Sequence, residues 1–183
     1  SGIMNPVGVI VDGEAASDWL GNSVSGGIDF NADGMMDWIV GAVYQGSGSA
    51  GATYVVFGSK SYPDEIDSTF FDGTNGFKIV GEVSSDNNGW SVSGAGDVNG
   101  DRFGDILVSS RGWDNGGTSS VGRSYVIFGR MGAWPAVFNL SALNGANGFK
   151  MSASLAYEYS GASVSGSGDV NNDGFDDLLI GSP

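Results

Sequence analysis

The chain has 183 residues, 40% of them hydrophobic, which is enough to build a buried core. Its 21 acidic and 7 basic residues give a net charge of −14, which argues against nucleic acid or an anionic membrane as a partner and favours cations as ligands. The absence of cysteine and histidine excludes disulfides, thiolate or imidazole zinc sites, and catalytic units that need either residue.

The elements, taken in chain order, form a repeat with no helical period. The abundant glycine (33 residues) favours turns and an all-β protein. Short runs rich in β-branched and aromatic residues, separated by Gly, Asn, Asp and Ser, are predicted to be strands. In the first copy they lie at 8–11, 23–26, 37–40 and 54–58, in the second at 76–79, 91–94, 105–108 and 125–129, and in the third at 148–151, 163–166 and 177–180.

Each copy is therefore predicted to be a four-stranded antiparallel meander. A meander of this size cannot cover both of its faces alone, so the copies are expected to stack radially as blades of a β-propeller. The small residues of the Ser-Val-Ser-Gly run suit an innermost strand, and the continuous apolar run that follows suits a strand covered on both faces. We place the repeats at about 8–75, 76–147 and 148–183, the third incomplete, within a single unit over 1–183.

A nine-residue acidic segment follows each Ser-Val-Ser-Gly run. Its positions 1, 3, 5 and 9 are Asp, Asn, Asp and Asp in all three copies. Calcium takes six to eight oxygen ligands, and short side chains on alternate loop residues turn inward around one ion, with a backbone carbonyl at position 7. The predicted ligands of the three Ca²⁺ sites are Asp29, Asn31, Asp33, Met35 and Asp37, then Asp97, Asn99, Asp101, Phe103 and Asp105, then Asp169, Asn171, Asp173, Phe175 and Asp177.

Two other structures have similar patterns of loop residues. An EF-hand begins with the same pattern but needs a bidentate Glu at position 12, where this chain has Val40, Val108 and Ile180 within predicted strands. A turn capped only by its own Asx side chains is the other reading, and threefold repetition disfavours it. Calcium is preferred over Mg²⁺ and Mn²⁺ because its geometry is less strict.

At these residues the chain resembles the FG-GAP repeats of the integrin α-subunit propeller. Phe57-Gly58 and Phe128-Gly129 match the first element of that repeat, and Gly41-Ala42-Val43 and Gly181-Ser182-Pro183 are near matches to its last element. The resemblance implies a propeller, usually seven-bladed, with calcium loops between the first two strands of a blade. It also implies extracellular or cell-surface work in adhesion or ligand binding.

The second repeat departs from the family pattern at two places. Arg102 stands where the loop normally has glycine, at a position expected to need a positive φ, and so predicts a weaker site. Ser109-Ser110-Arg111 replaces the Gly-Ala-Pro element. The chain also begins at a fourth strand and stops two strands into the third copy. We therefore expect the remaining blades to come from the same or neighbouring chains, and this segment alone to oligomerise or to be unstable.

Three functions are compared. The leading hypothesis is a calcium-stabilised module that recognises a protein or glycan, and the alternative is a subunit of a surface filament joined through blade edges. Catalysis, with Glu14, Glu82 or Glu158 as carboxylates, is disfavoured because the first two are equivalent turn residues. Trp113 and Trp134 are the tryptophans predicted to contact a ligand, and Trp38 is predicted to be core. Asn139 begins the one glycosylation sequon, and no run of about 20 apolar residues predicts membrane insertion.

Overall fold

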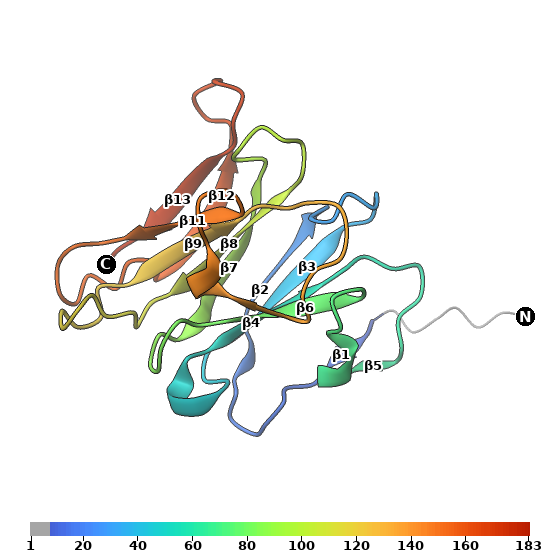
Figure 1. The fold of residues 1–183 in the computed structure, drawn as a ribbon, viewed down its shortest axis with the longest axis horizontal. Helices are drawn as coiled ribbons and strands as arrows, with labels where there is room; N and C mark the ends of the chain where they lie inside the picture. Colours follow the sequence, from blue (N-terminus) through green and yellow to red (C-terminus); the bar gives the residue numbers. More distant parts are fainter. Residues whose placement is uncertain (1–7) are drawn as a thin grey trace, which may run out of the picture.

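The computed structural model describes residues 8–183 and is built of β-sheets (Figure 1). The structure contains four-stranded antiparallel meanders, as predicted, but each takes its outer strand from the start of the next copy of the repeat. The first blade contains β2 (Leu20–Ile28), β3 (Asp37–Ala42), β4 (Ala52–Val56) and β6 (Gly76–Val80), and the second contains β7 (Asn88–Gly96), β8 (Asp105–Ser110), β9 (Arg123–Ile127) and β11 (Gly148–Ser152). The hairpin of β12 (Ser163–Gly168) and β13 (Asp177–Gly181) begins a third.

Short elements connect the blades in a way that the sequence did not reveal. Strand β10 (Val137–Asn139) pairs in parallel with β6, so the segment between β9 and β11 leaves the second blade and lies along the outer edge of the first. Strands β1 (Ile10–Val11) and β5 (Glu65–Ile66) form an equivalent parallel pair. The helices are single turns, namely η1 (Ser47–Ser49), η2 (Ser68–Phe70) and η3 (Leu140–Ala142). Among residues 8–183, no helix has the length and hydropathy needed to span a bilayer.

The Ser-Val-Ser-Gly strands lie beside one another at the inner edge of the blades, as predicted. The amide of Gly94 on β7 donates to the Ser25 hydroxyl on β2 over 3.0 Å, and the amide of Gly166 on β12 donates to the Ser93 hydroxyl over 3.1 Å. A Cβ added at Gly166 would lie 2.4 Å from the carbonyl oxygen of Gly94. Only small residues permit this approach, which explains the composition of the run.

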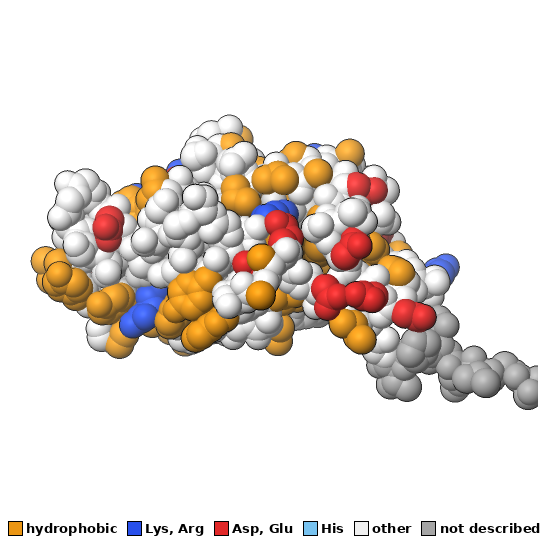
Figure 2. All heavy atoms as spheres, turned by 90° about the horizontal axis from the view of Figure 1, so that it is seen from below, with side chains coloured by type: hydrophobic (Ala, Val, Ile, Leu, Met, Phe, Trp, Pro, Cys, Tyr) orange, Lys and Arg blue, Asp and Glu red, His pale blue; other side chains and the backbone are white. Residues whose placement is uncertain are grey.

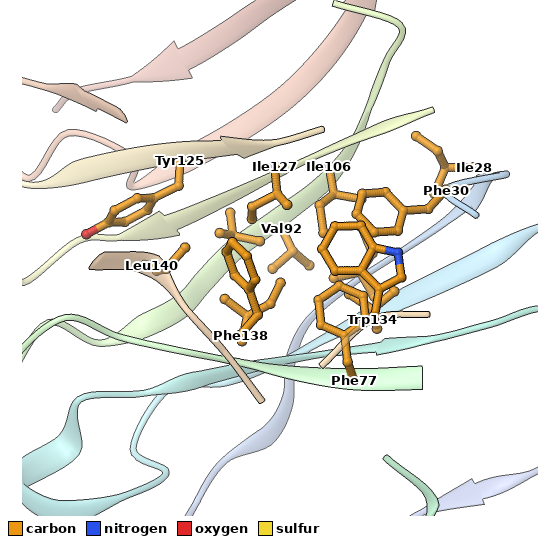
Figure 3. Packing of buried hydrophobic residues seen from close by; sticks show 14 of the residues in the cluster. Ile28, Phe30, Phe77, Val92, Ile106, Tyr125, Ile127, Trp134, Phe138 and Leu140 are labelled. Carbon is orange, nitrogen blue, oxygen red and sulfur yellow. The ribbon is translucent and has the colours of Figure 1, made fainter. Parts of the chain in front are cut away.

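The largest hydrophobic cluster fills the space between the first and second blades (Figure 3). Trp134 belongs to this cluster, stacks on Phe77 at 4.6 Å between ring centroids, and lies tilted against Phe30 at 4.8 Å. The prediction that Trp134 and Trp113 offer a contact surface is wrong, because both are buried, at 5% and 8% exposure. Trp134 precedes the β10 crossover, which brings it between the blades, so its Pro-containing connection is not a surface loop.

Candidate metal-binding loops

The three acidic loops are the tips of equivalent hairpins. They join β2 to β3, β7 to β8, and β12 to β13, and the tips point to the same end of the molecule, the upper side of Figure 1. Position 12 of each loop, at Val40, Val108 and Ile180, lies within the second strand of its hairpin. The prediction of a β-hairpin loop rather than a helix-loop-helix is therefore confirmed.

The first loop turns its oxygen-bearing side chains inward. The Asp29 carboxylate accepts hydrogen bonds from the amides of Asp33 and Gly34, each over 3.1 Å. The Asn31 side-chain oxygen also accepts from the Asp33 amide, over 3.0 Å, and the Asn31 amide group donates to the Asp33 carboxylate over 2.9 Å. The Asp33 carboxylate accepts from the Met35 amide over 2.8 Å. Positions 1, 3 and 5 are thus brought together within one turn.

The other two loops repeat this arrangement. In the second, Asp97 accepts from the amides of Asp101 and Arg102 over 3.0 and 2.7 Å. In the third, Asp169 accepts from Asp173 and Gly174 over 3.0 and 2.9 Å. The side chains of Asn99 and Asn171 donate to Asp101 and Asp173 over 2.8 and 2.9 Å. The structure therefore brings the predicted residues at positions 1, 3 and 5 together in all three copies.

Two positions in each loop adopt the left-handed backbone conformation. Position 6 has φ of 84° at Gly34, 74° at Arg102 and 93° at Gly174, so the predicted positive φ at Arg102 is confirmed. Position 4 also has positive φ, which the sequence did not signal because this position is Ala32, Gly100 and Asn172. A non-glycine residue in this conformation is strained by about 1–2 kcal/mol.

In the first two loops, the Asp at position 9 is more buried than the other acidic residues and has different hydrogen-bond partners. The Asp37 carboxylate is buried and accepts from the Phe30 amide over 2.8 Å and from the Gly58 amide over 2.6 Å. Asp105 is held in the same way by the amides of Val98 and Gly129, both over 2.9 Å. This second function of the position 9 carboxylate, which fastens the loop to the glycine of the Phe-Gly element, has no signal in the sequence of the loop itself. Each oxygen keeps a further lone pair for a cation.

Burial sets the electrostatics of these carboxylates. It raises the pKa of Asp37 to about 6 and that of Asp105 to about 7, against the lowering effect of the two amide hydrogen bonds that each receives. The charges of the other loop carboxylates add to the rise. Burial therefore shifts Asp37 and Asp105 toward the protonated form, and a nearby positive charge would oppose this shift.

The donor set of each loop is made entirely of oxygen. Among residues 8–183, no amide donates to the position 7 carbonyls of Met35, Phe103 and Phe175, so these remain open to a ligand. Within the same residues, no three acidic side chains converge closely enough to hold a metal by carboxylates alone. A site would therefore combine carboxylate, Asn amide and backbone oxygens. This combination fits a hard cation such as Ca²⁺ and not a metal that prefers sulfur or nitrogen.

Backbone hydrogen bonds connect each loop to the next. The Gly104 amide donates to the Asp29 carbonyl over 3.1 Å, and the Asp176 amide donates to the Asp97 carbonyl over 3.0 Å. The Asp176 carboxylate additionally accepts from the Asp97 amide over 2.7 Å. Position 8 of one loop is thus bonded to position 1 of the preceding loop, so ordering of one loop supports its neighbour.

The carboxylates considered for catalysis are structural. Glu82 pairs with Arg123 over 2.7 Å and with Lys150, and it accepts from the Tyr125 hydroxyl over 3.0 Å. Burial alone would raise the pKa of Glu82, but the hydrogen bonds and charges of Lys150 and Arg123 outweigh it and lower the pKa. Glu14 is held similarly by Lys78, Tyr54 and Gln45, and Glu158 accepts from the amides of Ser154 and Leu155.

The fold and its acidic loops together define the structural class of this chain. Radially stacked four-stranded meanders, each with an acidic hairpin loop beside the inner strand, make this chain a segment of β-propeller blades. The FG-GAP repeat model matches residues 88–127 and 160–183. These two segments match FG-GAP repeats, and part of the chain is similar to integrin α chains.

Two proteins similar to this chain are integrin α chains. The chain is 36% identical over 97 residues to integrin alpha pat-2 of Caenorhabditis elegans and 34% identical over 97 residues to integrin alpha pat-2 of Caenorhabditis briggsae. Each match covers 53% of this chain and 7% of the relative. The chain thus spans a small part of the length of these relatives.

Proposed function

We propose that this chain is a calcium-stabilised recognition module that works in adhesion, outside the cell or at its surface, and does not act as an enzyme. The observation that carries the proposal is the threefold convergence of Asp, Asn and Asp oxygens in hairpin loops that also present an open carbonyl. The similarity to integrin α chains supports the adhesive role and the location.

Calcium would be held at positions 1, 3, 5, 7 and 9 of each loop. The bound ion supplies positive charge that offsets the mutual repulsion of three carboxylates. The chain's own residues would shape and anchor the site. The left-handed residues at positions 4 and 6 bend the loop around the ion, and Asp37 and Asp105 fasten the loop to the blade. The ion would thereby hold both strands of the hairpin, and through the bonds between loops, the neighbouring blade.

The test compares unfolding in calcium and in chelator. If each site has a dissociation constant of about 10⁻⁴–10⁻³ M, as in extracellular EF-hand modules, about 10 mM calcium adds roughly 1.4–2.7 kcal/mol per site. For a chain of this size each kcal/mol raises the melting temperature by about 2–4 °C. Melting that does not respond to calcium would refute the proposal.

Variants in which one loop is changed give the number of calcium ions that the chain binds. Asp33→Ala, Asp101→Ala and Asp173→Ala are each expected to remove one bound ion, measured by calorimetric titration. Asp64→Ala is the matched control, because Asp64 is exposed and lies outside the loops. Equal calcium binding by the control and the three loop variants would contradict the site assignment.

A second candidate function is assembly through open blade faces, with another blade as the partner. Equivalent valines differ in exposure: Val24 in the first blade is 68% exposed, whereas Val92 and Val164 are 6% and 7% exposed. Val24 lines an apolar hollow of about 610 Å³ with Val11, Leu20 and Trp38. A blade that packs here as the first packs on the second would cover it.

The opposite end of the blade series has a matching open face. Leu179 on β13 is 65% exposed, whereas Leu107, its equivalent on β8, is fully buried by the next blade. Val24→Asp and Leu179→Asp are expected to reduce self-association in light scattering. Leu155→Asp, at a residue 65% exposed in the loop before β12, is the control. If the unmodified chain were a monodisperse monomer in light scattering, assembly through open blade faces would be refuted.

A further inference from the structure

The face opposite the acidic loops contains a small polar pocket. Figure 2 shows this face, where hydrophobic side chains gather toward the end formed by the segments after β8 and before β12. The pocket has a volume of about 270 Å³, and its walls include Ser85, Asn87, Arg111, Asp114 and Tyr159. This volume is just below the roughly 300–1,000 Å³ usual for drug-sized ligands, so the pocket suits one small ring.

Arg111 is fixed in this pocket by two aromatic rings. Its guanidinium carbon lies 4.4 Å from the ring centroid of Trp90 and 4.3 Å from that of Tyr159. Among residues 8–183, Arg111 forms no salt bridge and no hydrogen bond, whereas Arg123 and Lys150 are paired with Glu82. The planar guanidinium therefore contacts two aromatic rings, and its N–H groups have no acceptor among the described residues.

The walls around Arg111 offer acceptors as well as donors. One oxygen of Asp114 accepts from the Ser120 amide over 2.6 Å, which holds this carboxylate in the wall. The Tyr159 amide donates to the Ser120 carbonyl over 3.0 Å, so both walls are tied together before any ligand binds. The ring of Tyr157, which is 63% exposed, has its centroid 6.3 Å from that of the Tyr159 ring.

This pocket is particular to the second repeat. Ser109-Ser110-Arg111 stands where the first repeat has Gly41-Ala42-Val43, and Val43 is fully buried. The fold itself therefore does not require an arginine at this position. A cation that the fold does not need, clamped and unpaired in a cavity, indicates a ligand.

We propose that this pocket binds a carbohydrate, one pyranose ring with its hydroxyl groups directed at Arg111 and Asp114. Each sugar hydroxyl both donates and accepts, as this mixed wall requires, and Tyr159 adds an aromatic ring to the wall. A polyanion fits less well, because Asp114 lies in the wall and the chain carries a charge of −14. The inference gives a ligand class to the proposed recognition function and rests on it.

The test is an NMR titration of the full chain in calcium with methyl glycosides of glucose, galactose, mannose and N-acetylglucosamine. At least one glycoside is expected to produce saturable shifts of the Arg111 Nε–H and Trp90 indole signals. Arg111→Lys keeps the charge but loses the planar fork, and is expected to weaken binding by about tenfold or more. Arg130→Lys is the matched control, since Arg130 also lies over a tryptophan, Trp134, but outside the pocket.

Several results would overturn the carbohydrate site. These are absence of shifts with all four glycosides, unchanged binding in Arg111→Lys, and binding of acetate or a Glu-rich peptide in place of every neutral glycoside. A thermal melt of each variant shows whether it is folded. The calcium-dependent melting shift is measured on the same samples, so failure of the sugar site and failure of the calcium proposal give different results.

Discussion

Replacing Trp134 by alanine tests the packing between the first two blades. Loss of a buried Trp side chain costs about 3–5 kcal/mol. The Trp134 indole N–H is buried without a hydrogen-bond partner in the described structure, and its removal returns part of a penalty of about 1–3 kcal/mol. We therefore expect a loss of about 2–4 kcal/mol in the free energy of unfolding, or roughly 4–16 °C in melting temperature.

Urea unfolding followed by far-UV circular dichroism measures this loss, with Trp19→Ala as the control. Trp19 is 57% exposed, so its replacement is expected to change stability by less than about 1 kcal/mol. Trp134→Phe keeps an aromatic ring against Phe77 and removes the unpartnered N–H, and should recover most of the loss. If Trp134→Ala and Trp19→Ala were equally stable, Trp134 would not stabilise the packing between the two blades.

Three further changes follow from particular contacts. Glu82→Gln leaves two cations without their carboxylate and should cost roughly 1–3 kcal/mol at neutral pH, measured by urea unfolding. Because the folded pKa of Glu82 lies below its ordinary 4.5, its contribution is present above that value and disappears as the pH falls through the folded pKa. The variant should therefore show a flatter acid unfolding curve, and an unchanged curve would contradict the ion-pair assignment. Gly129→Ala places a Cβ 2.2 Å from a backbone oxygen and should cost about 1–3 kcal/mol, whereas Gly8→Ala, with open space around it, should have little effect in the same assay. Arg102→Gly relieves the positive φ and removes a cation beside the second loop, so its calcium affinity by calorimetry should rise, and an unchanged affinity would show that neither feature weakens the site.

The sequence was informative wherever a local pattern determined the structure. The Ser-Val-Ser-Gly strands, the hairpin loops and the positive φ at Arg102 follow from residue size, alternation and turn chemistry. The β10 crossover was not predictable because a three-residue strand has no period, and its pairing with β6 is a long-range event. The same crossover buried Trp134, whose surroundings in the sequence resemble an exposed loop.

The Arg111 pocket was missed for a related reason. Its walls come from three segments, before β7, after β8 and before β12, that are brought together only when adjacent blades pack. Sequence comparison of the repeats marked Arg111 as a departure, but not the two aromatic residues that clamp it. Trp90 and Tyr159 belong to different repeats, so no spacing within one repeat relates them.

Strand β8 connects the two proposed sites directly. It begins at Asp105, the position 9 carboxylate of the second acidic loop, and ends at Ser110, immediately before Arg111. All six of its residues are buried, and it is hydrogen-bonded to β7 on one side and β9 on the other. A buried strand paired on both edges has little freedom to move, so the bonds that fix Asp105 also fix the start of the Arg111 segment. A cation in the loop would therefore act on the opposite face by reducing local opening of this hairpin, without any change in the geometry of the pocket.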